Sequence, residues 1–202
     1  MIVYLHDVIL SMPHLFEASA FDANSDEKYS ANFLIDKTDA KNLDAVKAGI
    51  NAALEKTFRD KAATAGKAIV AAGKMWALRD GDGKVNKNSE PVKGYAGRLF
   101  VSAKNKHQPP VYDKDGVTPI TKDDGRLYPG CIVSAKIDIV AGEKPSNQVY
   151  AYLQGIQLRG DGERLGGGVA APGDFAPVPG AQKGGFDPTA GGTTAKGVET
   201  LY

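Results

Sequence analysis

The sequence has a single cysteine, three histidines and almost no excess of either charge. Its 202 residues include 25 Lys and Arg against 24 Asp and Glu, a net charge of +1. Such a chain carries no strong electrostatic field of one sign, so any basic surface that binds an anionic partner must be local. Cys131 cannot form an internal disulfide, and its apolar neighbours Ile132 and Val133 favour a buried thiol, as expected in a reducing cytoplasm.

Long hydrophobic runs are also missing from the sequence. No segment approaches the roughly 18 apolar residues that a membrane helix needs. The first ten residues include Tyr4, His6 and Asp7 and therefore lack the uninterrupted apolar core of a signal peptide. We expect a soluble cytoplasmic protein with no membrane partner.

Motifs of catalysis and of metal or nucleotide binding are missing as well. The histidines and the cysteine do not have the spacing of a standard zinc site. The pairs Gly66-Lys67 and Gly73-Lys74 lack the Ser or Thr that follows the lysine of a phosphate-binding loop. Residues 80–84 begin like a calcium loop, but Pro91 stands where the bidentate Glu belongs. The sequence therefore predicts no cofactor, no metal and no enzymatic activity.

The last 37 residues, 166–202, differ in composition from the rest of the chain. They contain 10 Gly and 4 Pro and few aliphatic side chains. Such a segment buries too little apolar surface to offset a backbone ordering cost of about 1 to 2 kcal/mol per residue. We expect one folded domain over residues 1–165 and a flexible, disordered tail over 166–202.

Six short segments of the predicted domain have the composition of strands, and turn-forming residues separate them. They are residues 2–10, 28–35, 74–79, 95–103, 131–140 and 149–158. One amphipathic helix is predicted where Leu43, Val46, Ile50, Leu54 and Phe58 recur at helical spacing, with Thr38 as its N-cap. These elements predict a mainly β fold, an antiparallel barrel like the oligonucleotide-binding (OB) fold. An open α+β sandwich is the alternative.

Positive charge is concentrated in residues 74–106, where eight Lys and Arg stand against three Asp and Glu. Alternation along the strand at 95–103 assigns Val101 to the core and places Phe100 on the other face, between Arg98 and Lys104. An aromatic ring between two cations can stack on a base while the phosphates on either side are neutralised. This pattern favours a single-stranded nucleic acid as ligand.

Two tyrosines of the last predicted strand, Tyr150 and Tyr152, should also point outward. They either fill the sheet surface as cross-strand pairs or form a second stacking platform. Trp76, Tyr95 and Tyr112 are weaker candidates, and for Trp76 a place in the core is the alternative. The candidate DNA-binding residues are Lys74, Trp76, Arg79, Lys93, Tyr95, Arg98, Phe100, Lys104, Lys106, Tyr112, Tyr150 and Tyr152.

Seven motifs follow one another along the chain. They are Lys28-Tyr29-Ser30-Ala31-Asn32-Phe33-Leu34-Ile35, Leu78-Arg79-Asp80-Gly81-Asp82, Gly94-Tyr95-Ala96-Gly97, Gln108-Pro109-Pro110-Val111-Tyr112-Asp113, Tyr128-Pro129-Gly130-Cys131, Leu153-Gln154-Gly155-Ile156-Gln157 and Gly162-Glu163-Arg164-Leu165. In this order they resemble a family of phage single-stranded DNA-binding proteins, long catalogued as a domain of unknown function. The resemblance spans about residues 1–168 and implies an OB fold. It further implies binding of single strands with little sequence preference, in DNA replication or recombination within the infected bacterium.

Related single-strand binders often end in an acidic tail with a terminal aromatic residue that recruits replication proteins. Glu199, Leu201 and Tyr202 are the corresponding candidates here, for replication or recombination partners. The tail has only one net negative charge, so we do not expect it to block the DNA site strongly. The oligomeric state stays open, with a homodimer as one option. A virion structural or assembly module without DNA affinity is the main alternative function, and a metal-dependent nuclease would require converging carboxylates.

Overall fold

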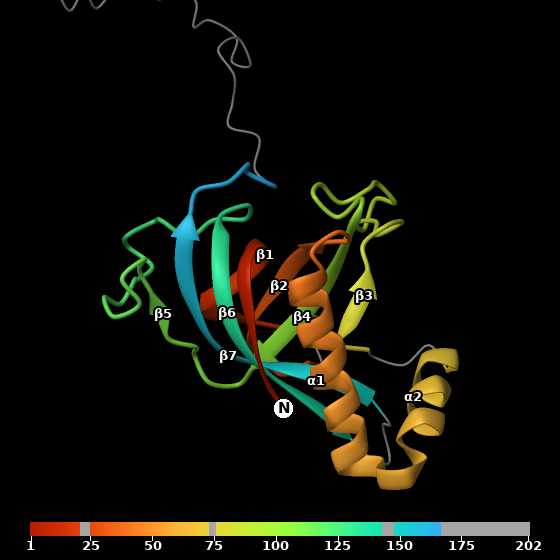
Figure 1. The fold of residues 1–202 in the computed structure, drawn as a ribbon. Coiled ribbons are helices and arrows are strands. Elements are labelled where there is room, and N and C mark those ends of the chain that lie inside the picture. The colour runs from red at the N-terminus through yellow and green to blue at the C-terminus, as the bar shows by residue number, and fades with distance from the viewer. Residues whose placement is uncertain (21–24, 73–75, 143–147, 167–202) are drawn as a thin grey trace, which may run out of the picture. The chain divides into compact units, whose positions relative to one another are not determined.

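The strands of the protein form one sheet that closes into a barrel. The computed structural model describes residues 1–20, 25–72, 76–142 and 148–166 (Figure 1). The strands are β1 (Ile2–Ser19), β2 (Lys28–Asp36), β3 (Leu78–Asp80), β4 (Arg98–Asn105), β5 (Val111–Tyr112), β6 (Ile132–Gly142) and β7 (Gln148–Gly160). The helices are α1 (Ala40–Phe58), a 3-10 turn at Arg59–Lys61, and α2 (Ala62–Ala71).

The sheet order is β3-β4-β2-β1-β6-β7-β5, and a parallel pairing of β4 with β7 closes the barrel. The register can be followed once around it, through Ile2, Asp138, Tyr152, Lys104, Ser30 and His14. The path leaves β1 at Ile2 and returns to the same strand at His14. This stagger is characteristic of a closed barrel with tilted strands, and it confirms the predicted OB-like fold.

β1 is much longer than the predicted strand at residues 2–10, because it pairs with two different strands along its length. Its first half pairs with β6 and its second half with β2. Register shifts occur between Leu5 and Val8 and between Ser11 and His14. Asp7 and Met12, within these shifts, have positive φ angles of 52° and 46°. Bulges of this kind bend a strand, which lets β1 curve around the barrel.

The predicted helix packs its apolar face on the barrel interior. Leu43, Val46, Ile50 and Leu54 are buried in the same cluster as the inward side chains of the strands. The helix approaches closely at Gly49, where an added Cβ would lie 2.5 Å from Val3 Cγ2. The predicted amphipathic helix is therefore confirmed, and its apolar face is part of the main core.

Details around the helices differ from the sequence predictions. The N-cap is Asp39 rather than Thr38, because the Asp39 side chain accepts a hydrogen bond from the Asn42 amide at 3.1 Å. The helix α2 and the two-residue strand β5 were not predicted, and the strand expected at 74–79 forms only from Leu78. Cys131 is fully buried, as predicted. Within the described ranges, no helix is both long enough and apolar enough to cross a membrane.

Candidate nucleic-acid interface

The outward sides of β2 and β4 form one continuous surface beside β3. Seven side chains lie on it, and we call them the outer face: Ser30, Asn32, Leu34, Arg79, Phe100, Ser102 and Lys104. The register places them in rows, with Leu34 opposite Phe100, Asn32 opposite Ser102, and Ser30 opposite Lys104. Arg79 of β3 extends the first row, because it pairs with Phe100.

Phe100 lies on this face but is not exposed, which corrects the sequence prediction. Alternation assigned its direction correctly, since Val101 belongs to the main core whereas Phe100 belongs to a second small cluster with Leu34 and Tyr95. Phe100 is only 3% exposed and Tyr95 only 1%. Their rings meet edge to face, with centroids 5.1 Å apart. Buried rings cannot stack on bases, so neither Phe100 nor Tyr95 is a stacking platform.

The segment between β3 and β4 covers Phe100, and sequence alternation gave no sign of this. The segment folds back on itself through a hydrogen bond from the Val92 amide to the Lys84 carbonyl at 2.9 Å. Gly81 makes the closest approach, because a Cβ there would lie 2.4 Å from the Tyr95 carbonyl oxygen. Residues 81–97 therefore carry Tyr95 and Lys84 onto the outer face.

Two cations lie above the buried rings, and we call Arg79 and Lys84 the cation pair. The Arg79 guanidinium carbon lies 4.6 Å from the Phe100 centroid, and Lys84 Nζ lies 5.2 Å from the same centroid and 5.3 Å from that of Tyr95. Partial desolvation lowers the pKa of both residues, and the charge of Arg79 lowers the pKa of Lys84 further. Within the described residues, neither forms an ion pair with a carboxylate. This arrangement would be stabilised by an anion such as phosphate.

A chain of hydrogen bonds across the outer face fixes the position of Arg79. Its Nη2 donates to Ser102 Oγ at 2.6 Å, and Ser102 in turn donates to Asn32 Oδ1. Asn32 Nδ2 donates to the Tyr95 hydroxyl at 2.7 Å, and that hydroxyl lies 3.1 Å from Ser11 Oγ. Ser11, Asn32, Ser102 and Lys84 were not among the predicted site residues. For the three polar residues the only signal in the sequence is the alternation of polar with apolar residues along the strands.

Most of the other predicted cations already have carboxylate partners. The pairs are Lys93 with Glu163 at 2.9 Å, Arg98 with Asp36 at 3.5 Å, and Lys106 with Asp26 at 3.3 Å. The pairs of Lys93 and Lys106 are exposed and contribute little to stability, but all three pairs leave less net charge for a ligand. Lys104 is exposed and has no ion-pair partner in the described part of the chain, so it is the predicted cation that best complements the cation pair.

The two tyrosines of β7 point outward, as predicted. Their rings meet edge to face, with centroids 5.3 Å apart. Tyr150 is partly buried, whereas Tyr152 is 39% exposed. Tyr152 is in register with Lys104 of β4. An accessible ring therefore lies beside an accessible cation at the edge of the outer face, which is the pairing that the sequence analysis had assigned to Phe100.

The remaining predicted site residues do not join this surface. Trp76 packs against the main core, where its ring comes near Gly66 of α2. Tyr112 lies on β5, which pairs with the far half of β7, and Figure 1 shows β5 and β3 on opposite sides of the barrel. Lys74 and the tail candidates Glu199, Leu201 and Tyr202 lie outside the described residues.

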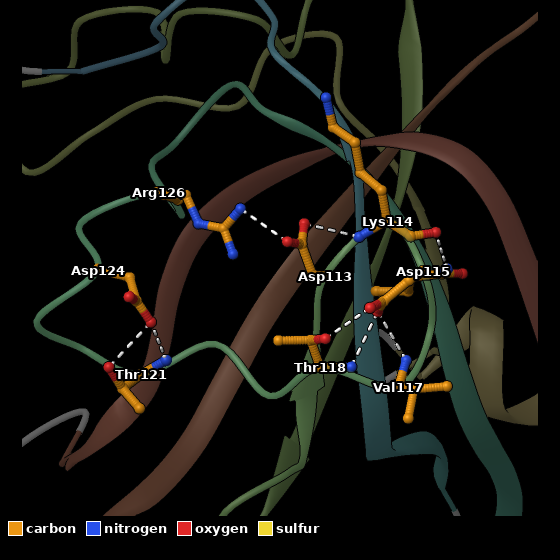
Figure 2. Close-up of polar contacts among 9 residues, drawn as sticks. Asp113, Lys114, Asp115, Val117, Thr118, Thr121, Asp124 and Arg126 are labelled. Carbon is orange, nitrogen blue, oxygen red and sulfur yellow. Dashed lines mark hydrogen bonds and ion pairs between the residues drawn. The ribbon is translucent and has the colours of Figure 1, made fainter.

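Residues 113–126, which we call the acidic loop, form a second charged region with a different character. Asp113 accepts a hydrogen bond from the Lys114 amide and pairs with Arg126 at 2.9 Å (Figure 2). Asp115 accepts bonds from Thr118 and the Val117 amide, and Asp124 from the amide and hydroxyl of Thr121. These hydrogen bonds lower the pKa of all three carboxyls. In the described ranges no group of three or more metal-ligating side chains converges, here or elsewhere.

A closed barrel with a charged outer face on β2 and β4 places this protein in the OB class, whose members bind their ligands on the corresponding strands. The family model described as "Enterobacter phage Enc34, ssDNA-binding protein" matches residues 1–186, and this chain belongs to that family. The resemblance stated from the sequence motifs is thereby confirmed.

Individual relatives support the same assignment. "Putative protein p50" of Acyrthosiphon pisum secondary endosymbiont phage 1 is 35% identical over 175 residues, which is 86% of this chain and 91% of that protein. The structure of the bacteriophage Enc34 single-stranded DNA-binding protein in complex with ssDNA matches with a TM-score of 0.65 and 23% identity, over 82% of this chain and 89% of that one. The gp2.5 single-stranded DNA-binding protein of bacteriophage T7 matches with a TM-score of 0.53 and 12% identity, over 85% and 98%. At these identities the two solved structures show the fold alone.

Proposed function

We propose that this protein binds single-stranded DNA on its outer face, with little sequence preference, during phage DNA replication or recombination in the host cytoplasm. The observation that carries the proposal is the cation pair, two partly desolvated charges without a carboxylate partner in the described residues. Membership of the family and the DNA complex of a structural neighbour support the choice of ligand.

The mechanism that we propose separates phosphate binding from base stacking. Arg79 and Lys84 bind one stretch of the sugar-phosphate chain, and Lys104 binds a second. Tyr152, next to Lys104, offers its exposed ring to a base. The buried rings of Phe100 and Tyr95, which we call the buried floor, lie beneath the cation pair and hold it in place by cation–π contacts.

Weak sequence preference follows from how the polar groups of the outer face are used. The neutral polar side chains there are Ser30, Asn32 and Ser102. Asn32 and Ser102 are engaged in the hydrogen-bond chain that positions Arg79. Ser30 carries a hydroxyl, which can both donate and accept and so distinguishes weakly between base edges. Stacking and phosphate contacts do not distinguish strongly between bases either.

The test is fluorescence anisotropy with a labelled single-stranded oligonucleotide and a duplex control, with and without magnesium. Three phosphate contacts at a slope of about −0.7 each predict roughly a twentyfold loss of affinity between about 50 and 200 mM salt. A protein that binds no single strand, or binds it with no salt dependence, contradicts the proposal and favours a virion assembly role. Degradation of the oligonucleotide with magnesium would indicate a nuclease.

The tail residues Glu199, Leu201 and Tyr202 stay candidates for recruiting replication or recombination proteins. Deletion of residues 167–202 is expected to leave oligonucleotide binding within about twofold, because the tail's net charge is slight. A large gain in affinity on deletion would show instead that the tail competes with DNA.

A further inference from the structure

A second pairing of an aromatic ring with a cation lies on the outward side of β1 and β6. Tyr4 is 55% exposed, and Lys136 Nζ lies 5.8 Å from its ring centroid. The two residues face each other in the register of the sheet. Lys136 is exposed and has no ion-pair partner within the described residues. Neither residue belongs to the outer face or to the main core.

We propose that Tyr4 and Lys136 form a second contact site for single-stranded DNA. The DNA occupies this site when it continues beyond the outer face and crosses β7. We call these two residues the β1–β6 platform. This inference rests on the proposed function, and it makes the DNA path extend around the barrel instead of ending at β4. Tyr4 would stack on a base, and Lys136 would neutralise an adjacent phosphate.

The register of the barrel supplies the continuity between the two sites. Lys104 is in register with Tyr152, Tyr152 with Asp138, and Asp138 with Ile2. The platform lies two residues further along β1 from Ile2. Only two β-strand spacings of about 4.8 Å separate β7 from β1. Single-stranded DNA that passes Tyr152 therefore reaches the platform directly.

Gly155 and Pro110 determine where such a path can cross β7. Gly155 is the β7 residue in register with Lys136, and Pro110 lies against it, because a Cβ added at Gly155 would lie 3.4 Å from Pro110 Cγ. The path therefore runs over Tyr152 and Asp138 and not over Gly155. Asp138 is the carboxylate on the route, and the N-terminal ammonium pairs with it at 2.5 Å. Lys104 at one end of this path and Lys136 at the other have no carboxylate partner among the described residues, and their positive charge complements a phosphate chain.

The platform can be tested by comparing oligonucleotides of two lengths. An OB fold covers about 4 to 16 nucleotides, so an oligonucleotide of about 8 should fill the outer face alone and one of about 20 should also reach the platform. The variant Tyr4→Ala/Lys136→Gln should lose about tenfold in affinity for the longer oligonucleotide and less than about twofold for the shorter one. The matched control Lys67→Gln/Val70→Ala, which also removes one exposed lysine and one exposed apolar side chain on α2, should change neither.

A fluorescent variant keeps the test independent of any loss of folding. The protein has a single tryptophan, Trp76, which packs beside α2. In Tyr4→Trp, the longer oligonucleotide should quench the added emission, whereas the shorter one should not.

Three outcomes overturn the inference. The first is unchanged affinity of Tyr4→Ala/Lys136→Gln for the longer oligonucleotide, and the second is an equal loss for both lengths. The third is a lower molecular mass of this variant than of the unaltered protein in light scattering, with unchanged DNA affinity. That result would assign the platform to contact with a second copy of the chain. Failure of the proposed function is distinguishable, because the unaltered protein would then not bind the shorter oligonucleotide.

Discussion

The outer face and the acidic loop both carry dense charge, but they satisfy it in opposite ways. In the loop, Asp113, Asp115 and Asp124 are each bound by amides, hydroxyls or a cation of the same loop. On the outer face, Arg79 and Lys84 lie over aromatic rings, without a carboxylate partner among the described residues. Charges that are satisfied internally build structure, whereas charges that are left unsatisfied are available to a ligand. Counting charges along the sequence cannot make this distinction.

The largest effect should come from removing the floor of the outer face. Phe100→Ala should lower the free energy of unfolding by about 3 to 5 kcal/mol, because it empties a buried position beneath the cation pair. Urea denaturation measures the change. Val117→Ala in the acidic loop, at a side chain that is 76% exposed, is the matched control and should leave stability unchanged. If Phe100→Ala is as stable as its control, the buried floor is not a structural unit.

The next largest effect concerns the charges themselves. Arg79→Gln/Lys84→Gln should weaken single-strand binding about 100-fold, since each lost charge-assisted contact contributes about 1.5 kcal/mol. The salt slope should also become shallower by about 1.4. Lys114→Gln/Lys122→Gln removes the same charge from the acidic loop and should change the affinity less than about twofold. Equal losses in the two variants would show that only total charge matters, which removes the contrast between the regions.

Tyr152→Ala tests whether the exposed ring at the edge of the outer face stacks on a base. Loss of an exposed stacking ring should weaken binding by about 1 to 3 kcal/mol, with little change in the unfolding midpoint. Tyr152→Phe retains the ring and should bind nearly as well as the unaltered protein. Anisotropy titrations of both variants measure the difference. Similar losses in the two variants would assign the effect to the hydroxyl and not to stacking.

Acid should weaken the hydrogen bonds that Asp115 accepts within the acidic loop. Hydrogen bonds lower the pKa of Asp115 from its ordinary value of 3.8. A carboxyl with a lowered pKa stabilises the folded loop above its ordinary pKa, and that contribution is lost as the pH falls through the lowered value. The amide signals of Val117 and Thr118 should therefore shift in NMR spectra below about pH 4. In Asp115→Ala these signals should no longer respond in that way, and an unaltered response would contradict the assignment.

Much of the fold could be predicted because it depends on local patterns. Alternation and turn residues located the barrel strands, and helical spacing located α1. The second half of β1 was missed because Asp7 and Met12 interrupt the alternation with bulges. The short strand β5 has too few residues for any pattern to be recognised.

The candidate site was predicted only in part, because it depends on contacts between residues that lie far apart in the sequence. The direction of Phe100 followed from alternation, but its burial depends on Tyr95, which residues 81–97 fold onto it. The contact of Tyr95 with Ser11 joins positions 84 residues apart. Which cations lack carboxylate partners is likewise a property of the folded surface. Lys93 was therefore predicted as a site residue and Lys84 was not, although among the described residues Lys93 has a carboxylate partner and Lys84 has none.

The central claim is that the unsatisfied charges of the outer face form the DNA site, and NMR mapping tests it most directly. A single-stranded oligonucleotide of about 8 nucleotides would be titrated into the isotope-labelled protein. The account predicts shifts in the amide signals of Arg79, Lys84, Ser102 and Lys104, with the signals of residues 113–126 unchanged. Shifts concentrated in the acidic loop, with the cation pair unaffected, would contradict it.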